Sequence, residues 1–336
     1  MTSPAKIGLI GTGRIGKVHA ASIAALPETT LQWVCDPFIE GAEATAQLFG
    51  GVHVTADPRD VISSGDVDAV VIAAPTPTHV DLIDLAIDAG VPVLCEKPID
   101  LDILRVDALR EKARAASTLI SLGFNRRFDP HFAELHRRVS AGEIGALEQL
   151  IITSRDPEPP PAAYVAVSGG IFRDMTIHDF DMARFFVPNI VEVTAHGGNQ
   201  FSGMIADADD YDSAVVVLRG ADGEFVTITN SRHSVYGYDQ RLEAFGDEGL
   251  LQVGNIGPSN VRSSTSAGID TGSEIYGNIV RYTDAYRLEL AAFVEALRGG
   301  EDRTPGFEDG RAALILADAA LLSAKENITV AVDLSA

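Results

Sequence analysis

The chain has 336 residues, a formal net charge of -22, and 46% hydrophobic against 22% charged residues. This length exceeds what one hydrophobic core usually supports, so two domains are expected. The negative charge, with no basic stripe to offset it, argues against nucleic-acid binding, and the lack of a signal-peptide pattern or of an apolar run of about 18 residues predicts no membrane partner and a cytoplasmic location.

Short apolar or β-branched runs alternate with helical patterns over the first third of the chain. We predict strands at 5–10, 31–35, 69–73, 92–95 and 118–122, and helices near 14–26, 39–49, 78–89 and 101–115. Asp57-Pro58 indicates one further helix start. Such alternation is typical of a parallel sheet with crossover helices, so residues 1–123 are predicted to form a doubly wound, Rossmann-type domain. Cys35 and Cys95 end two of these strands without a paired spacing, so reduced, buried thiols are expected.

The pattern changes after residue 123, where strands follow one another with short turns. Helices are predicted near 130–140, 174–186, 283–298 and 308–323, and strands near 147–153, 190–197, 212–219, 224–231, 240–246 and 250–253. The Gly/Ser-rich segment 254–273 is predicted to be a long loop. Residues 124–336 are therefore expected to form an α+β domain with an open, mostly antiparallel sheet. Since helices would cover one face only, we expect homo-oligomer formation through the other.

A glycine-rich motif, Gly11-Thr12-Gly13-Arg14-Ile15-Gly16, directly follows the first predicted strand and opens a helical pattern. In a dinucleotide-binding loop the first glycine allows a tight turn, the second lets pyrophosphate approach the backbone, and the third permits close helix packing. The helix N-terminus, with Arg14 and Ile15, would hold the phosphates. The alternative is a tight strand-to-helix turn that binds no ligand.

An acidic residue, Asp36, ends the second predicted strand 25 positions after Gly11. There a carboxylate would accept hydrogen bonds from the adenosine ribose, which favours NAD over NADP. A 2'-phosphate would require a nearby Arg or Lys, yet Pro, Phe and Ile follow. A helix cap or turn residue is the alternative for Asp36.

The segment Ala73-Ala74-Pro75-Thr76-Pro77-Thr78-His79 leaves a strand at the carboxyl edge of the predicted sheet, where ligands bind in such folds. Thr76 and His79 are therefore candidate cofactor contacts. Thr78 is equally compatible with a helix N-cap.

Two further groups carry chemistry. In Glu96-Lys97-Pro98 the lysine falls where a nicotinamide ring would lie, and Glu96 is a further candidate cofactor contact. Asp174 and His178 are four residues apart, which would place an acid/base pair on one face of a helix. The alternatives are that Asp174 caps that helix and that His178 is a core histidine.

Three motifs together carry a family resemblance: the start AKIGLIGTGRIG, CEKP at 95–98, and GGIFRDMTIHDFD at 169–181. The chain resembles the Gfo/Idh/MocA oxidoreductases and, within that family, the bacterial inositol 2-dehydrogenases. The similarity runs essentially end to end. It implies a Rossmann domain followed by an open-faced sheet domain, NAD as cofactor, and a homotetramer.

The resemblance also implies the catalytic set, Lys97, Asp174 and His178. His178 would accept a proton from a substrate hydroxyl while hydride leaves the same carbon for the nicotinamide. Lys97 would donate a hydrogen bond to the oxygen on which charge develops. Asp174 would orient His178 and Lys97 and place a negative charge near the cationic nicotinamide.

Substrate contacts are implied for Arg127, Asp156 and Tyr238, besides Asp174 and His178. Some inositol dehydrogenases have His-Arg-Asn where this chain has Ser154-Arg155-Asp156, so the polyol bound is left open. A salt bridge is the alternative for Arg127, and strand alternation, with one ring in the core, is the alternative for Tyr236 and Tyr238. The histidine spacing indicates no metal site.

These observations predict NAD-dependent oxidation of a cyclic polyol, namely myo-inositol to its 2-keto form (scyllo-inosose). One alternative is a dehydrogenase for another inositol isomer or a sugar. Two others keep the fold and change the function: a glycosidase that uses bound NAD without net turnover, and a nucleotide-sensing regulator. Sensors of this kind typically lose the lysine or the histidine, and this chain has both.

Overall fold

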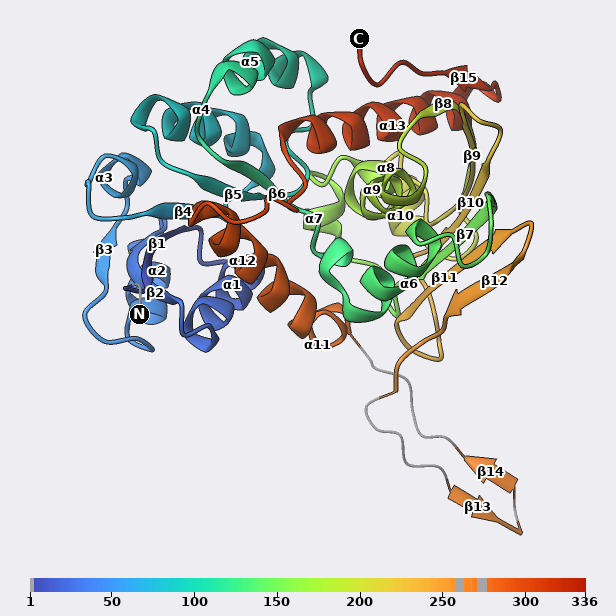
Figure 1. The fold of residues 1–336 in the computed structure, drawn as a ribbon, viewed down its shortest axis with the longest axis horizontal. Helices are drawn as coiled ribbons and strands as arrows, with labels where there is room; N and C mark the ends of the chain where they lie inside the picture. The colour runs from blue at the N-terminus through green and yellow to red at the C-terminus, as the bar shows by residue number, and fades with distance from the viewer. Residues whose placement is uncertain (1–2, 258–262, 267, 271–276) are drawn as a thin grey trace. The chain divides into compact units, whose positions relative to one another are not determined.

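The computed structural model describes residues 3–257, 263–266, 268–270 and 277–336 (Figure 1). The chain divides into two compact units. One comprises Met1–Phe128 with Thr283–Leu314, and the other comprises Asp129–Tyr282 with Ile315–Ala336. This grouping differs from the predicted ranges 1–123 and 124–336, because the segment 283–314 belongs to the first unit.

The described part of the first unit contains a six-stranded parallel sheet. Its order is β3-β2-β1-β4-β5-β6, and the strands are β1 (Ala5–Ile10), β2 (Thr29–Cys35), β3 (His53–Thr55), β4 (Ala69–Ile72), β5 (Val93–Glu96) and β6 (Ile120–Gly123). This order is that of a doubly wound fold, so the predicted fold class of this half is confirmed. The sequence analysis missed β3, because three residues are too few to show a strand pattern.

Helices flank this sheet in the order expected for crossover connections. They are α1 (Arg14–Ala25), α2 (Ile39–Ala46), α3 (Pro58–Ile62), α4 (His79–Ala89), α5 (Ile103–Ala115) and α12 (Thr283–Leu297), with 3-10 turns η1 (Thr76–Thr78) and η2 (Asn125–Phe128). The predicted start at Asp57-Pro58 is confirmed, because the Asp57 carboxylate accepts a hydrogen bond from the Arg59 N–H at 2.9 Å. Leu290 and Phe293 of α12 pack into the same core as Leu9 of β1.

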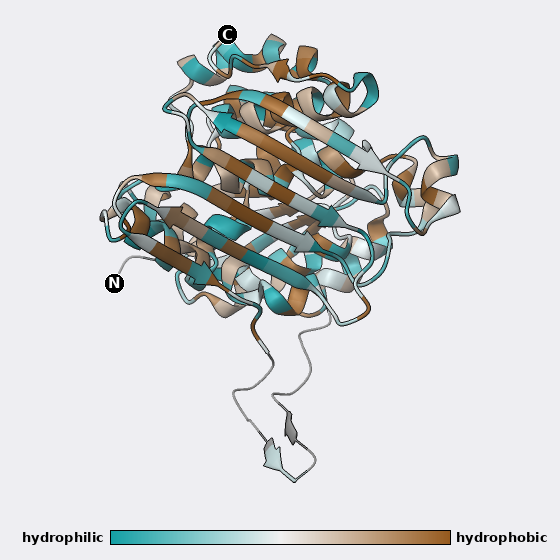
Figure 2. Cartoon of the chain, turned by 90° about the vertical axis from the view of Figure 1, so that its right-hand side faces the viewer, coloured by the Kyte–Doolittle hydropathy of each residue, from teal (hydrophilic) through white to brown (hydrophobic). Residues whose placement is uncertain are grey.

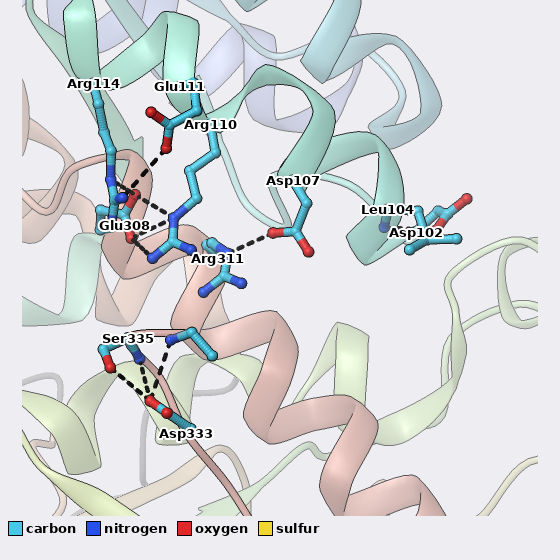
Figure 3. A network of polar contacts seen from close by, with 11 residues as sticks. Asp102, Leu104, Asp107, Arg110, Glu111, Arg114, Glu308, Arg311, Asp333 and Ser335 are labelled. Atoms are coloured by element: carbon cyan, nitrogen blue, oxygen red, sulfur yellow. Dashed lines mark hydrogen bonds and ion pairs between the residues drawn. The ribbon is translucent and has the colours of Figure 1, made fainter.

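An ion-pair network fixes the beginning of α13 (Phe307–Glu326) to α5 (Figure 3). Both Arg110 and Arg114 donate to the Glu308 carboxylate, at 3.0 Å from each Nε. Arg311 donates to Asp107 at 2.6 Å. Burial raises the pKa of Glu308, but the hydrogen bonds from the two arginines outweigh burial and the net pKa is lowered. These contacts, formed over almost 200 residues of sequence, anchor the segment 283–314 in the first unit.

The described part of the second unit contains a seven-stranded mixed sheet. Its order is β12-β11-β7-β10-β9-β8-β15, and the strands are β7 (Leu147–Arg155), β8 (Ile190–Gly198), β9 (Ser213–Gly220), β10 (Phe225–Ser231), β11 (Asp239–Gly246), β12 (Gly249–Val253) and β15 (Val330–Ala331). All neighbours pair antiparallel except β7 and β10, which are parallel. The predicted open, mostly antiparallel sheet is confirmed.

The remaining helices belong to the second unit, apart from the start of α13. They are α6 (Pro130–Ser140), α7 (Ala162–Val165), α8 (Gly170–Asp174), α9 (Ile177–Phe186), α10 (Gly203–Asp207) and α11 (Asn278–Arg281). Figure 2 shows one face of this seven-stranded sheet toward the viewer, and no helix of the described chain crosses that face. Burial alternates along β9, so that Val215 and Val217 are 45% and 39% exposed on this face.

One predicted loop is wrong in part. Within 254–273 the structure contains a small antiparallel hairpin of β13 (Ser263–Thr265) and β14 (Gly268–Asp270). Its Gly/Ser/Thr composition carries no apolar alternation, so the pattern indicated only a loop. The stretches 258–262, 267 and 271–273 of the same prediction lie outside the described residues.

Both cysteines are buried and unpaired, as predicted. Burial raises the pKa of Cys35 to about 12 and moves the pKa of Cys95 upward as well, so neither thiol is a reactive nucleophile. Over the described residues no helix is long and apolar enough to cross a membrane.

Candidate active site

The glycine loop lies between β1 and α1, and at two of its three glycines close backbone contacts leave no room for a larger side chain. Gly11 has φ +98°, and a Cβ there would come within 2.5 Å of the Ala73 carbonyl oxygen. A Cβ at Gly16 would lie 2.0 Å from the Gly11 oxygen. At Gly13 a Cβ would meet no protein atom within 4 Å. The fold itself therefore requires the first and third glycines, whereas the second leaves the backbone open to close approach by a ligand, which fits a pyrophosphate.

The N-terminus of α1 also suits an anion. Gly13 is its N-cap, no side chain caps it, and its first turn contains no acidic residue. The positive end of the helix dipole is therefore left uncompensated by a carboxylate there. Arg14, which is exposed, and Ile15 begin this helix, in agreement with a phosphate site at these residues.

Asp36 closes the same loop from the end of β2. Its Oδ2 accepts hydrogen bonds from the Thr12 N–H at 2.8 Å and the Thr12 hydroxyl at 2.7 Å, and its Oδ1 accepts one from the Phe38 N–H at 2.9 Å. Burial raises the pKa of Asp36, but these hydrogen bonds outweigh burial and the net pKa is lowered. The carboxylate thus stays ionised and shapes the glycine loop, a role the sequence did not indicate. Each oxygen can accept a further hydrogen bond, so ribose binding by Asp36 stays a prediction.

The two candidates after β4 differ in their surroundings. Thr76 begins η1 and is half-buried, which is compatible with a cofactor contact. His79 is 1% exposed, and its Nδ1 and Nε2 lie 2.8 Å from the carbonyl oxygens of Pro98 and Ala74. Both ring nitrogens are engaged by backbone, so the geometry does not support the predicted direct contact of His79 with a cofactor. His79 instead ties the segment after β4 to the segment that carries Lys97.

Lys97 directly follows β5 and is half-buried at the carboxyl end of the parallel sheet, the edge at which ligands bind in this fold. The preceding Glu96 is buried, with its Oε1 2.7 Å from Nε2 of His19 on α1. The His19 ring in turn packs edge-on against Tyr286 of α12. Glu96 therefore fixes the end of β5 to α1, and its direct contact with a cofactor stays a prediction. The sequence analysis missed His19, although its position one turn after Gly16 places it on the buried face of α1.

In the second unit, the predicted helix 174–186 is wrong at its start. Asp174 is the last residue of α8, and His178 is the second residue of α9. Met175 and Thr176 form a turn between them, with both N–H groups donating to the Ile171 carbonyl oxygen at 2.9 Å. The two side chains consequently do not share one helical face. Nor does Asp174 cap α9, whose N-cap is Thr176 and has no side-chain cap.

Buried polar contacts from β10 and β7 explain the break. The Thr176 hydroxyl donates to Asn230 Oδ1 at 2.7 Å, and the Asn230 amide donates to Asp179 at 2.7 Å. The Ser154 hydroxyl donates to the other oxygen of Asp179 at 2.6 Å. Since Asp179 and Thr176 are fully buried, these hydrogen bonds must be made. They fix the first turn of α9, and with it His178, to the ends of two strands.

Asp174 is held by residues that no sequence motif identified. Its Oδ1 accepts a hydrogen bond from the Tyr164 hydroxyl at 2.8 Å, and its Oδ2 lies 3.4 Å from Nη1 of Arg232. Arg232 is 1% exposed and follows β10. The carboxylate therefore has a fixed orientation and a buried positive partner.

The predicted substrate contacts fall in both units. Arg127 lies in η2 and donates to Asp309 at 3.0 Å within the first unit, as the salt-bridge alternative expects. Asp156 is half-buried directly after β7. Tyr238 is buried edge-on against Tyr282, whereas Tyr236 is exposed, so the two rings alternate as expected, although both precede β11. Substrate contact by Arg127, Asp156 and Tyr238 stays a prediction. No group of three or more His, Cys, Asp or Glu residues suited to a metal ion occurs in the described part of the chain.

Comparisons with known proteins cover nearly the whole chain. Residues 5–124 match the oxidoreductase family with an NAD-binding Rossmann fold, and residues 132–252 match the GFO/IDH/MocA C-terminal domain. The chain is 44% identical to inositol 2-dehydrogenase of Rhizobium meliloti strain 1021, over 97% of this chain and 99% of that protein. It resembles the crystal structure of a myo-inositol dehydrogenase from Corynebacterium glutamicum, with a TM-score of 0.94, 54% identity, and coverage of 98% and 99% of the two chains.

A more distant structure contains ligands. The chain is 29% identical to a scyllo-inositol dehydrogenase from Lactobacillus casei with bound NAD(H) and scyllo-inositol, at a TM-score of 0.89 and coverage of 98% and 99%.

The contacts of Asp36 lead to a testable prediction about cofactor choice. Asp36→Ala should weaken NAD binding roughly ten- to a hundredfold, because hydrogen bonds to a charged acceptor are lost, and should weaken NADP binding less, because a 2'-phosphate is no longer repelled. Thr12→Val is the matched control, since it disturbs the same loop contact and leaves the carboxylate in place. Calorimetric titration with both dinucleotides measures the two affinities. An unchanged NAD/NADP ratio in Asp36→Ala would remove Asp36 from ribose recognition.

Proposed function

This chain belongs to the Gfo/Idh/MocA oxidoreductase family, and we propose that it oxidises myo-inositol to 2-keto-myo-inositol (scyllo-inosose). It is an NAD-dependent oxidoreductase of the class that acts on CH–OH groups. The observation that carries the choice of substrate is identity of 44% with an inositol 2-dehydrogenase along 97% of the chain. The geometry agrees, because Lys97 lies at the carboxyl edge of the parallel sheet that also carries the glycine loop, and Asp174 and His178 lie near each other in the chain of the second unit.

The residues of the first unit suit NAD. Gly11, Gly13 and Gly16 with the start of α1 would hold the pyrophosphate, and Asp36 would accept hydrogen bonds from the adenosine ribose. When bound, NAD supplies an acceptor for the hydride that leaves the substrate carbon. Thr76, Glu96 and Lys97, all at the carboxyl edge of the sheet, are the remaining proposed contacts.

The proton chemistry is assigned to three side chains. His178 accepts the proton of the substrate hydroxyl, since an imidazole titrates near neutral pH. Lys97 donates a hydrogen bond to the same oxygen and stabilises the charge that develops there as the carbon–hydrogen bond breaks. Asp174, held by Tyr164 and Arg232, supplies a fixed negative charge that favours a cationic nicotinamide. The products are the ketone and NADH, with the proton on His178.

The identity of the inositol isomer depends on the residues around the ring. Arg127, Asp156 and Tyr238 are proposed to contact the substrate hydroxyls. Ser154, one of the two departures from the His-Arg-Asn triplet, has a buried hydroxyl bonded to Asp179. Its effect on specificity would therefore act through the position of α9. Scyllo-inositol is the second candidate substrate, supported by its presence in the 29% identical Lactobacillus casei structure.

The proposal predicts NADH formation with an inositol. Purified protein with excess NAD at alkaline pH should reduce NAD rapidly with one inositol isomer, measured at steady state against other isomers and several aldoses. Lys97→Ala is the control. It should lose hydride transfer by a factor on the order of a hundred or more, because the hydrogen bond to the developing charge is gone. It should still bind NAD, because the glycine loop is unchanged.

Each outcome of this assay has one meaning. Absence of NADH with every polyol would reject the dehydrogenase and favour the glycosidase or the regulator. Wild-type turnover in Lys97→Ala would reject the role of the lysine. Rapid NADH formation with scyllo-inositol but not myo-inositol would correct the isomer and leave the chemistry in place.

The assignment of His178 as base predicts a pH dependence. The value of kcat/KM should rise with pH through the neutral range and then level off, as the imidazole loses its proton. His178→Asn should lower kcat/KM by about a hundredfold or more and abolish this rise. His53→Asn, an exposed histidine in β3, is the control and should keep the wild-type profile. A rise that persists in His178→Asn would assign the titration to another group.

A homotetramer is proposed on the exposed face of the second sheet. Register places neighbouring apolar side chains on that face, of which the more exposed are Val215, Val217, Phe225, Phe245 and Leu250. Exposed apolar side chains gathered on one face of a sheet are typical of a protein–protein contact surface. We also propose a cytoplasmic location, in keeping with two buried free thiols.

A charge placed on this face tests the tetramer. Val217→Lys should dissociate the protein, because burying an unpaired ammonium group in the interface is costly, and light scattering measures the mass. Leu104→Lys replaces a 73% exposed leucine of α5 and should leave the mass unchanged. A wild-type protein that is monomeric at all concentrations would contradict the proposal.

A further inference from the structure

A fully buried arginine, Arg232, lies next to one of the proposed catalytic residues, and it touches neither the reacting proton nor the hydride in the mechanism above. We propose that Arg232 is a positioning residue that holds Asp174 in its working orientation by fixing both ends of helix α8. This inference rests on the proposed function for the role of Asp174, but its structural basis lies entirely within the second unit.

The contacts of Arg232 are with two carboxylates. Nη1 lies 3.4 Å from Asp174 Oδ2, and Nη2 lies 3.6 Å from Asp210 Oδ2. The side chains of Asp174 and Asp210 are themselves 15% and 9% exposed. A guanidinium ion is costly to bury unless opposite charges lie beside it, and the same is true of the carboxylates. The three charges therefore depend on one another.

Asp210 carries the second contact to the start of α8. Its Oδ1 accepts a hydrogen bond from the Ile171 N–H at 2.8 Å, in the first turn of that helix. Gly170 has φ +83°, and a Cβ there would come within 2.8 Å of the same oxygen. Only glycine allows this approach without displacing the carboxylate. Arg232 thus reaches the first turn of α8 through Asp210 and its last residue, Asp174, directly.

Helix α8 needs such support because it has only five residues, too few to be stable without tertiary contacts. The backbone N–H of Arg232 donates to the Asp212 carbonyl oxygen at 2.8 Å, which fixes the arginine itself. Two positions earlier, Asn230 holds Thr176 and Asp179. The end of β10 therefore sets the helix that ends in Asp174 and the helix that begins next to His178.

Loss of the guanidinium should be felt at Asp174. Two carboxylates would then face each other without a counter-charge, and Asp174 would rotate or take up a proton. Displacement of a catalytic group by about an ångström can cost on the order of a hundredfold in rate. The affinity for NAD should change little, because the glycine loop and Asp36 of the first unit supply most of the proposed contacts.

A double-mutant cycle tests the proposal. Arg232→Met should lower kcat with inositol about ten- to a hundredfold, a far larger change than that in the Kd for NAD. In an Asp174→Asn background, Arg232→Met should have much less effect, because its target is already lost. Arg232→Lys should recover part of kcat, since it restores a positive charge without the two-pronged geometry. Arg137→Met, at a 65% exposed arginine of α6, is the matched control and should change nothing.

Thermal unfolding gives a second readout that needs no substrate. It is measured for the four proteins of the cycle: the wild type, Arg232→Met, Asp174→Asn and the double variant. The melting temperature of the double variant should fall by less than the sum of the two single decreases, because Asp174→Asn removes one of the facing carboxylates. Additive decreases, or a loss of kcat that multiplies with that of Asp174→Asn, would overturn the proposal.

A conservative variant covers the case in which Arg232→Met does not fold. Tyr164→Phe removes the hydrogen bond that the half-exposed Tyr164 donates to Asp174. As a single variant, Tyr164→Phe should lower kcat. In the Asp174→Asn background it should cause little further loss of kcat. Combined with Arg232→Lys, it should increase the loss of kcat that Arg232→Lys causes. Independent effects of these two variants would reject the shared hold on Asp174. If the wild type oxidises no inositol, the proposed function fails, and the melting-temperature cycle still decides whether Arg232 holds Asp174.

Discussion

Contacts between buried polar groups hold the helices of the second unit, and several of these contacts converge on the carboxyl end of β10. Asn230 and Arg232 are two residues apart in the chain. Asn230 is hydrogen-bonded to Thr176 and Asp179, and Arg232 forms an ion pair with Asp174. None of these pairings is local in the sequence. Without them, two short helices would carry unsatisfied groups into the interior. The positions of Asp174 and His178 follow from this strand end more than from the two helices that carry them.

The first unit reaches its geometry by a different route, through close backbone approach. Gly11 and Gly16 permit β1 and α1 to meet at distances that a single added carbon would prevent. Asp36 then bonds to Thr12 and completes the loop. Lys97 is placed by covalent position after β5, supported by the Glu96 contact with His19. The nucleotide site therefore depends on a few small residues, whereas the positions of Asp174 and His178 in the second unit depend on contacts of charged and amide side chains.

Much of the secondary structure could be predicted from the sequence, because strands and helices show themselves in local patterns of apolar residues. Parallel strands buried on both faces show continuous apolar runs, and the five longer strands of the first sheet are visible for that reason. The short β3 and the β13–β14 hairpin are not, since they have too few apolar residues. The helix expected at 174–186 does not begin at Asp174, because the Thr176 hydroxyl donates a hydrogen bond to Asn230, 54 residues away in the sequence. His79 looked like a ligand from its place after β4, and only the fold brings the carbonyl groups of Ala74 and Pro98 to its ring.

The sequence by itself determined the doubly wound fold, the nucleotide loop, and the presence of Lys97, Asp174 and His178, because strand alternation, glycine spacing and motif position are local properties. Only the tertiary structure decided that Asp174 and His178 lie on separate helices, that α12 packs with the first unit, and that His19 contacts Glu96 and Arg232 contacts Asp174. The reason is physical: a buried charge or amide must find a partner wherever the chain supplies one. Those partners lie tens to hundreds of residues away, beyond the reach of any local pattern.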